Sequence, residues 1–203
     1  MPRDPLLRES LTVAREDHHA GATPMDQRQD AMLAAARFTV AVNEAIRAEP
    51  GRQVATVGRL EATPNTTNVV AGRVVLTVDL RDLDDAKVAR FAARFREMAA
   101  EIGRATDTSF AFRDLVSSKA ALADARVMDA IDASAAALGL SSQRMPSGAG
   151  HDAQELSLIC PMGMIFVPSV GGISHSPREF TKPEDVANGV NVLLHAVQRV
   201  DAL

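Results

Sequence analysis

The sequence is poor in aromatic residues and in cysteine: it has no Trp, no Tyr, seven Phe and one Cys in 203 residues. Base-stacking platforms and aromatic cages need such rings, so both are excluded as the main mode of binding. The single Cys160 cannot form an intramolecular disulfide, and the opening MPRDPLLRES lacks the apolar segment of a signal peptide. We therefore expect a cytoplasmic protein.

Long apolar runs and an excess of basic charge are also lacking. No stretch approaches the roughly 18 apolar residues of a membrane-spanning helix, so no membrane partner is expected. The 22 basic and 26 acidic residues leave a net charge of −4, which disfavours binding to a phosphate backbone and hence a nucleic-acid partner. With 46% apolar and 24% charged residues the composition is that of a globular protein, long enough for one large or two small domains.

Hydrophobic periodicity predicts six elements in the first part of the chain, in the order strand, helix, strand, strand, helix, strand. The first helix, of roughly 24 residues, begins at a cap formed by Thr23, ends at Pro50 and buries Met32, Leu33, Ala36 and Val40. The second carries an apolar stripe from Val88 to Ile102 and ends at Gly103. The strands are predicted at 11–14 (ending at the charged run 15–17), 53–62, 73–81 and 109–116. This βαββαβ order folds as a four-stranded antiparallel sheet with both helices on one face.

The part after Lys119 reads differently. A helix through Val127 and Leu138 ends at Gly139, the run 162–167 reads as a buried strand, and a final helix carries a stripe made of Val186, Val190, Leu193 and Val197. A lone apolar strand needs neighbours in a sheet before it can be buried. The expectation is that part of the sheet is missing here.

Polar residues that could do chemistry gather in four loops, and each has a structural alternative. His18 and His19 lie in a turn and would point to opposite sides of an extended chain; Asn65 and Asn68 bracket a turn that Asn itself favours. Gly150 and His151 lie in a small-residue loop that leaves backbone amides free for an anion. His175 follows the apolar segment, where open α/β sheets bind ligands.

A metal site made by the chain unaided is not indicated. The histidines and Asp152 have neither the helical i, i+4 spacing nor the paired-cysteine spacing of zinc sites. Cys160, between apolar residues and Pro161, is predicted to be a core residue rather than a nucleophile.

Five segments in order, HHAGATPMDQRQDA, PNTTNVVAG, VDLRD, SGAGHDAQ and GGISHSPREF, resemble the N-carbamoyl-L-amino acid hydrolase, β-alanine synthase and allantoate amidohydrolase family. This family belongs to the aminoacylase and carboxypeptidase superfamily of two-metal enzymes. The resemblance implies an α/β fold with an α+β lid or dimerisation domain at 9–118. Residues 119–203 would form the C-terminal segment of the catalytic domain, and its N-terminal segment is expected to be absent from this chain.

The resemblance also assigns roles to residues. His19 is similar to the lid histidine that crosses the dimer to stabilise the oxyanion, so it is the expected catalytic residue. Substrate binding is expected from Asn68, Arg81, Gly150, His151 and, with less support, Asn65, with Arg81 holding a carboxylate by a bidentate pair. His175 is the one family metal ligand represented, for zinc or manganese; the general base and the other ligands would belong to the N-terminal segment.

Two functions follow as hypotheses. In the first, the chain is part of a metal-dependent amidohydrolase acting on a small ureido or carboxylate substrate. It forms a homodimer through the lid, holds no metal tightly by itself, and is active only with an N-terminal catalytic half. In the second, it is a non-catalytic dimerisation or small-carboxylate-binding module of the same descent.

Overall fold

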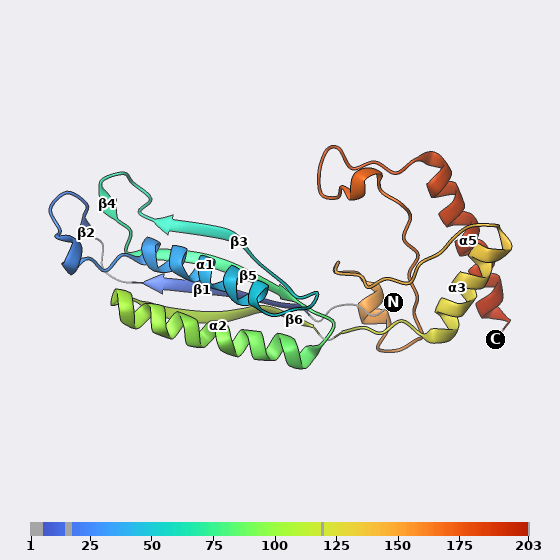
Figure 1. Ribbon diagram of the computed structural model, residues 1–203, viewed down its shortest axis with the longest axis horizontal. Coiled ribbons are helices and arrows are strands. Elements are labelled where there is room, and N and C mark those ends of the chain that lie inside the picture. Colours follow the sequence, from blue (N-terminus) through green and yellow to red (C-terminus); the bar gives the residue numbers. More distant parts are fainter. Residues whose placement is uncertain (1–5, 15–17, 119, 203) are drawn as a thin grey trace. The chain divides into compact units, whose positions relative to one another are not determined.

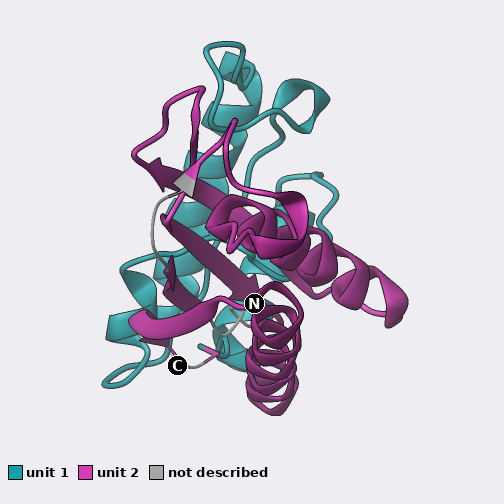
Figure 2. Ribbon diagram, turned by 90° about the vertical axis from the view of Figure 1, so that its left-hand side faces the viewer, with its two compact units in different colours: residues 1–3, 121–203 teal, residues 4–120 magenta. Residues whose placement is uncertain are grey.

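The computed structural model describes residues 6–14, 18–118 and 120–202. The chain divides between Ala120 and Ala121 into two compact units, which are coloured separately in Figure 2. The predicted charged run 15–17 and the junction residue Lys119 lie outside the described residues. In the described part, no helix is both long enough and apolar enough to cross a membrane.

The unit before residue 121 is built on a four-stranded antiparallel sheet in the order β3-β5-β1-β6 (Figure 1). Its strands are β1 (Leu6–Ala14), β3 (Val54–Thr63), β5 (Arg73–Arg81) and β6 (Ser109–Ser118). Two helices, α1 (Ala31–Ala48) and α2 (Asp85–Thr106), pack on one face of this sheet. The predicted βαββαβ fold of this region is confirmed.

The core between helices and sheet follows the alternation of the strands. β5 has the predicted bounds, and Val74, Leu76, Val78 and Leu80 are all buried on its helix-facing side. Phe38 of α1 is completely buried at the centre of a ring cluster that includes Phe95, Phe110 and Phe112. Aromatic residues are therefore few but concentrated in one place.

The first helix begins later than predicted. Met25–Gln27 form a short 3₁₀ turn, η1, and Arg28 is extended, so the helix begins only at Ala31, where the Asp30 carboxylate accepts a hydrogen bond from the Leu33 amide at 3.0 Å. Its predicted buried face was wrong for Leu33 and Val40, which are 44% and 56% exposed, whereas Met32 is partly buried against the core. The residues that face the sheet are small apart from Phe38 and Val42: Ala31, Ala34, Ala35, Phe38, Val42 and Ala45.

The end of α2 and the start of β1 also differ from the predicted bounds. α2 continues past Gly103 to Thr106 and is capped by Asp107 in the left-handed region; Gly103 is needed because a Cβ there would lie 2.7 Å from the Thr108 carbonyl oxygen. β1 begins five residues before the predicted strand, at Leu6, and includes Glu9, which is only 2% exposed and pairs with Arg96 of α2. Burial raises the pKa of Glu9 despite that opposite charge.

The unit after residue 120 contains α3 (Ala125–Ala137), the short α4 (Ala153–Leu156), the 3₁₀ turn η2 (Val170–Gly172) and α5 (Pro183–Asp201). α3 stops just before Gly139, the predicted terminating residue: Gly139 has a positive φ of 70°, and the amides of Gly139 and Leu140 donate to the carbonyls of Ala136 and Ala135. α3 and α5 pack against each other.

The predicted buried strand at 162–167 is wrong, since no strand is formed there and Phe166 and Val167 are 47% and 37% exposed. The predicted face of the last helix is exposed as well, because Val192 and Ala196 are the residues that α5 buries. The stripe that remains open consists of Val186, Val190, Leu193 and Val197. Both differences have one cause: no strand neighbours are supplied for this unit by the described residues, so its apolar surfaces stay uncovered.

Candidate functional site

His19 and Asn68 are brought side by side at one end of the sheet unit. β2 (His18–His19) and β4 (Val69–Val70) form a two-residue antiparallel ladder beyond the ends of β1 and β5, with His19 opposite Val69 (Figure 1). The Ala20 amide also donates to the Asn68 carbonyl at 2.9 Å. His19 and Asn68 are both exposed, so their side chains are accessible at this β2–β4 tip.

The imidazole of His19 has a defined partner. The Gly21 amide donates to His19 Nδ1 at 3.1 Å, and a Cβ on Gly21 would lie only 3.3 Å from His19 Cε1. Because Nδ1 accepts, the neutral ring carries its proton on Nε2 and can donate from there.

Asn65 lies in the same connection as Asn68, with a positive φ of 56°. Asn tolerates this left-handed conformation better than most residues, so the turn accounts for its presence. Its expected contact with substrate stays a prediction.

Arg81 lies at the opposite end of β5 from the tip. Eight residue steps separate Arg73 from Arg81, which at about 3.3 Å per residue is about 26 Å. Arg81 Nε and Nη2 donate to the two oxygens of Asp79 at 2.6 and 3.0 Å, and Arg8 Nη2 reaches the same carboxylate at 2.5 Å. Within one unit, His19 and Asn68 are therefore not brought together with Arg81.

The Asp79 carboxylate is held ionised by these two arginines. Burial raises the pKa of Asp79, but the hydrogen bonds and charges of Arg81 and Arg8 outweigh burial, and the net pKa is lowered. The geometry fixes the Arg81 guanidinium, since a bidentate pair defines its plane.

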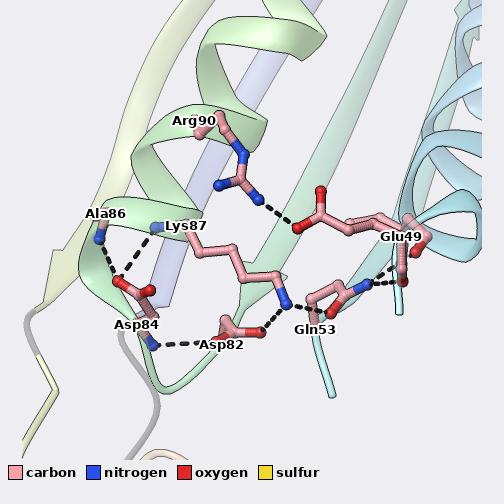
Figure 3. Close-up of polar contacts among 8 residues, drawn as sticks. Glu49, Gln53, Asp82, Asp84, Ala86, Lys87 and Arg90 are labelled. Carbon is pink, nitrogen blue, oxygen red and sulfur yellow. Dashed lines mark hydrogen bonds and ion pairs between the residues drawn. The ribbon is translucent and has the colours of Figure 1, made fainter. Parts of the chain in front are cut away.

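Directly after Arg81, a buried polar network joins three elements (Figure 3). Lys87 Nζ, in the first turn of α2, lies 3.3 Å from Asp82 Oδ2 and 2.6 Å from Gln53 Oε1. Gln53 Nε2 donates in turn to the carbonyls of Ile46 and Glu49 at the end of α1. The turn that follows Arg81 is thereby tied to both helices.

The glycine-rich and histidine loops of the second unit line one hollow. A space of about 980 Å³ is bordered by Ser147, Gly148 and Ala149 from one loop and by Gly172 and Ser174 from the other. Gly150 and His151 themselves are exposed, and His151 Nδ1 accepts from the Ala153 amide at 3.2 Å as α4 begins. Their expected contacts with substrate stay predictions.

His175 has an unusual backbone. Its φ of 54° lies in the left-handed region, and its amide donates to the Glu179 carboxylate at 2.8 Å. Holding a non-glycine residue in this conformation costs free energy, and such strained residues are common at functional sites.

A catalytic metal does not fit the donors of this chain taken alone. No three His, Cys, Asp or Glu side chains converge in the described ranges, whereas a catalytic zinc takes about three protein ligands. His175 supplies at most one of them.

The sequence interpretation missed three residues that hold other residues in place. Arg28 binds the turn beside the tip, Asp79 accepts hydrogen bonds from Arg81, and Glu179 accepts one from the His175 amide. All three lie inside the motifs quoted above, and that position was the only sign in the sequence that they matter. The prediction that Cys160 is a core residue was wrong, because it is exposed.

Comparison with known proteins places this arrangement in one class, the hydrolases of the M20 type. The model of Peptidase family M20/M25/M40 matches residues 11–199, and the chain belongs to this family.

Relatives within the family are amidohydrolases. The chain is 38% identical over 192 residues to the N-carbamoyl-L-amino acid amidohydrolase of Geobacillus stearothermophilus, covering 95% of this chain and 47% of that protein. It is 38% identical over 188 residues to the ureidoglycolate hydrolase of Arabidopsis thaliana, covering 91% and 40%.

Solved structures of two such proteins superimpose closely on this chain. AtUAH in complex with glyoxylate superimposes with a TM-score of 0.94 at 33% identity, covering 100% of this chain and 48% of that one. A hydantoinase/carbamoylase-family amidase from Burkholderia vietnamiensis gives 0.93 at 36% identity, covering 98% and 48%. The chain thus spans about half the length of the relatives that it matches.

Proposed function

We propose that this chain is the lid and C-terminal catalytic segment of a metal-dependent amidohydrolase. The substrate is an N-carbamoyl amino acid or an allantoate-like ureido compound, and the other catalytic residues come from an N-terminal segment outside residues 1–203. The observation that carries the proposal is the β2–β4 tip, which joins His19 to Asn68 although 49 positions separate them in the sequence.

The reaction adds water to a ureido or amide carbonyl, breaks the C–N bond and returns a proton to the leaving nitrogen. Negative charge develops on the carbonyl oxygen, where a fixed N–H donor is most useful. His19 supplies that donor through Nε2. Asn68 and the guanidinium of Arg81 hold the substrate carboxylate, and Gly150, His151 and Asn65 border the substrate.

His175 would supply one ligand of a zinc or manganese ion shared with the N-terminal segment. When bound there, such an ion would lower the pKa of a water molecule and polarise the carbonyl. In this proposal the remaining ligands and the general base come from the N-terminal segment, which agrees with the lack of a three-ligand cluster among the described residues.

The separation along β5 supports a homodimer. The tip and Arg81 are about 26 Å apart in one unit, too far for one small substrate to touch both. A second copy solves this if the tip of one lid reaches the site that contains the Arg81 of its partner.

The surface of α1 and the neighbouring edge strand β3 is the best-supported dimer contact. Leu33 and Val40 on α1 are exposed, as are Val54 and Leu60 on β3, and α1 packs against this strand. The other edge strand, β6, also exposes Leu115 and Val116, but α2 beside it exposes no large hydrophobic side chain. Pairing of two β3 edges would also protect an open strand.

A complementation assay tests the proposal. The chain is mixed with a separately produced N-terminal segment of the Geobacillus relative and manganese or zinc, and hydrolysis of N-carbamoyl amino acids, allantoate and ureidoglycolate is measured. We expect no turnover by the chain alone, turnover by the mixture, and loss of that turnover with His19→Ala or His175→Ala.

The exposed Glu97→Ala on α2 lies outside the proposed dimer contact, so it is the control and should leave the restored activity unchanged. Turnover by the isolated chain would contradict the proposal. So would a stable complex with the N-terminal segment and metal that shows no activity on any of these substrates.

A further inference from the structure

We propose that Arg28 is a positioning residue that locks the turn after His19, so that the imidazole keeps its proton on Nε2 and offers it as a donor. This inference rests on the proposed function for the use of that donor, but the lock itself is a property of the chain.

Both the backbone carbonyl and the side chain of His19 accept hydrogen bonds from residues of the turn that follows. The His19 carbonyl accepts from the Ala22 and Thr23 amides at 3.3 and 3.1 Å, while the Gly21 amide turns back to Nδ1 of the ring at 3.1 Å. The Gly21 contact fixes the tautomer only while residues 20–23 keep this shape.

Arg28 holds both sides of the turn with one planar group. Its Nε donates to the Thr23 carbonyl at 3.0 Å and its Nη2 donates to the Ala20 carbonyl. A guanidinium spans two acceptors in a fixed geometry, which a lysine ammonium on a flexible stem does not reproduce. These two carbonyls flank the amide of Gly21, so the clamp controls where that amide points.

The clamp also explains the late start of α1. The sequence favours a helix from Pro24, yet Arg28 is extended (φ −79°, ψ 132°) between η1 and α1. In this conformation its side chain reaches back to the turn. Arg28, the residue that makes the clamp, is therefore not helical although the local sequence favours a helix. Such departures from local preference are typical of residues at functional sites.

The absence of a side chain at Gly21 is also needed for the contact between its amide and the His19 ring. A Cβ at this position would come within 3.3 Å of His19 Cε1, closer than ordinary van der Waals contact. Any larger residue must move the ring or the amide. The other tautomer would present a lone pair from Nε2, which cannot stabilise an oxyanion.

The test uses the intact chain without substrate or metal. The ¹⁵N signals of the His19 imidazole are recorded by NMR above the imidazole pKa range and assigned with His19→Gln, which is practical because the sequence has five histidines. We expect the wild type to show the Nε2–H form. Arg28→Gln and Gly21→Ala should each shift the tautomer ratio toward Nδ1–H by about three- to tenfold, the equivalent of one lost hydrogen bond.

Arg37→Gln on the exposed side of α1 removes the same charge and should leave the ratio unchanged. Arg28→Lys should behave like Arg28→Gln, because charge without the planar fork does not restore the clamp. Far-ultraviolet circular dichroism confirms that each variant is folded. Wild-type tautomer ratios in folded Arg28→Gln and Gly21→Ala would overturn the proposal, as would an equal shift in Arg37→Gln.

The outcome is separate from that of the complementation assay. A tautomer lock together with a stable, metal-loaded complex that shows no turnover would refute the proposed function and leave the inference standing. In an active mixture we expect Arg28→Gln to lower kcat by about ten- to a hundredfold with little change in KM, as misplacement of a transition-state donor does.

Discussion

Lys87→Met is expected to destabilise the sheet unit strongly, although it changes one side chain in the first turn of a helix. Lys87 is 14% exposed and Asp82, its ionic partner, 9%. Lys and Met have similar helix propensities and similar length, so the substitution removes the charge and little else. It leaves the Asp82 carboxylate and the side-chain oxygen Oε1 of Gln53 without their shared donor.

The magnitude follows from this burial. Removing one partner of a buried ion pair costs about 3–5 kcal/mol, and the residual exposure of both groups reduces that to about 2–4 kcal/mol. Adding Asp82→Asn removes the orphaned charge, while the Asn oxygen can still accept from the Asp84 amide as Asp82 Oδ1 does at 3.0 Å. The double variant should therefore recover about 1–2 kcal/mol relative to Lys87→Met alone.

Urea unfolding provides the measurement. With no Trp or Tyr, the transition must be followed by circular dichroism and by the NMR signals of α2 amides, which report on this unit separately from the other. Arg90→Met is the matched control: the Arg90–Glu49 pair is 60% and 33% exposed, so its loss should cost at most about 1 kcal/mol.

Two results would refute this reasoning. One is a loss for Lys87→Met no larger than that for Arg90→Met. The other is a double variant less stable than Lys87→Met, which would mean that the Asp82 charge is not the source of the cost.

Three further predictions concern single positions. Gly103→Ala should lower stability by about 1–3 kcal/mol, because a Cβ 2.7 Å from the Thr108 carbonyl oxygen outweighs the better helix propensity; an unchanged unfolding midpoint would argue against that close contact. Asp79 has a lowered pKa in the folded chain, so its stabilisation is present above the unfolded pKa and is lost as pH falls through the folded one. Asp79→Asn should flatten this acid limb in midpoints measured against pH, and an identical limb would contradict the assignment. His175→Gly should raise stability by up to about 1 kcal/mol by relieving a φ of 54° while abolishing restored turnover; a lower unfolding midpoint would show that His175 is not strained.

The sheet unit could largely be predicted from sequence because its strands alternate cleanly. β5 is the clearest case: apolar and polar residues alternate from Arg73 to Arg81 and the predicted bounds are those of the strand. β1 was underestimated because Glu9 occupies a core-facing position. The partner that makes its burial tolerable, Arg96, is 87 positions away, and no local pattern shows it.

The fold of the second unit was harder to predict from the sequence, for a different reason. The apolar run 162–167 and the stripe of α5 indicate burial, and that burial depends on surfaces the described residues do not supply. The quoted motifs indicated the site residues, whereas the residues that position them did not stand out. Arg28 is one example, because its role depends on a turn conformation rather than on spacing along an element.

The order of strands also determines when this unit can fold during synthesis. β1, the first strand made, lies inside the sheet between β5 and β6, and the hydrogen bond from Ser109 to Ala14 spans 95 positions. Contacts this distant in sequence slow folding, since a long loop must close before they form. Both edges of β1 stay unpaired until β5 and then β6 leave the ribosome, so the nascent chain carries an open strand for most of the synthesis of this unit.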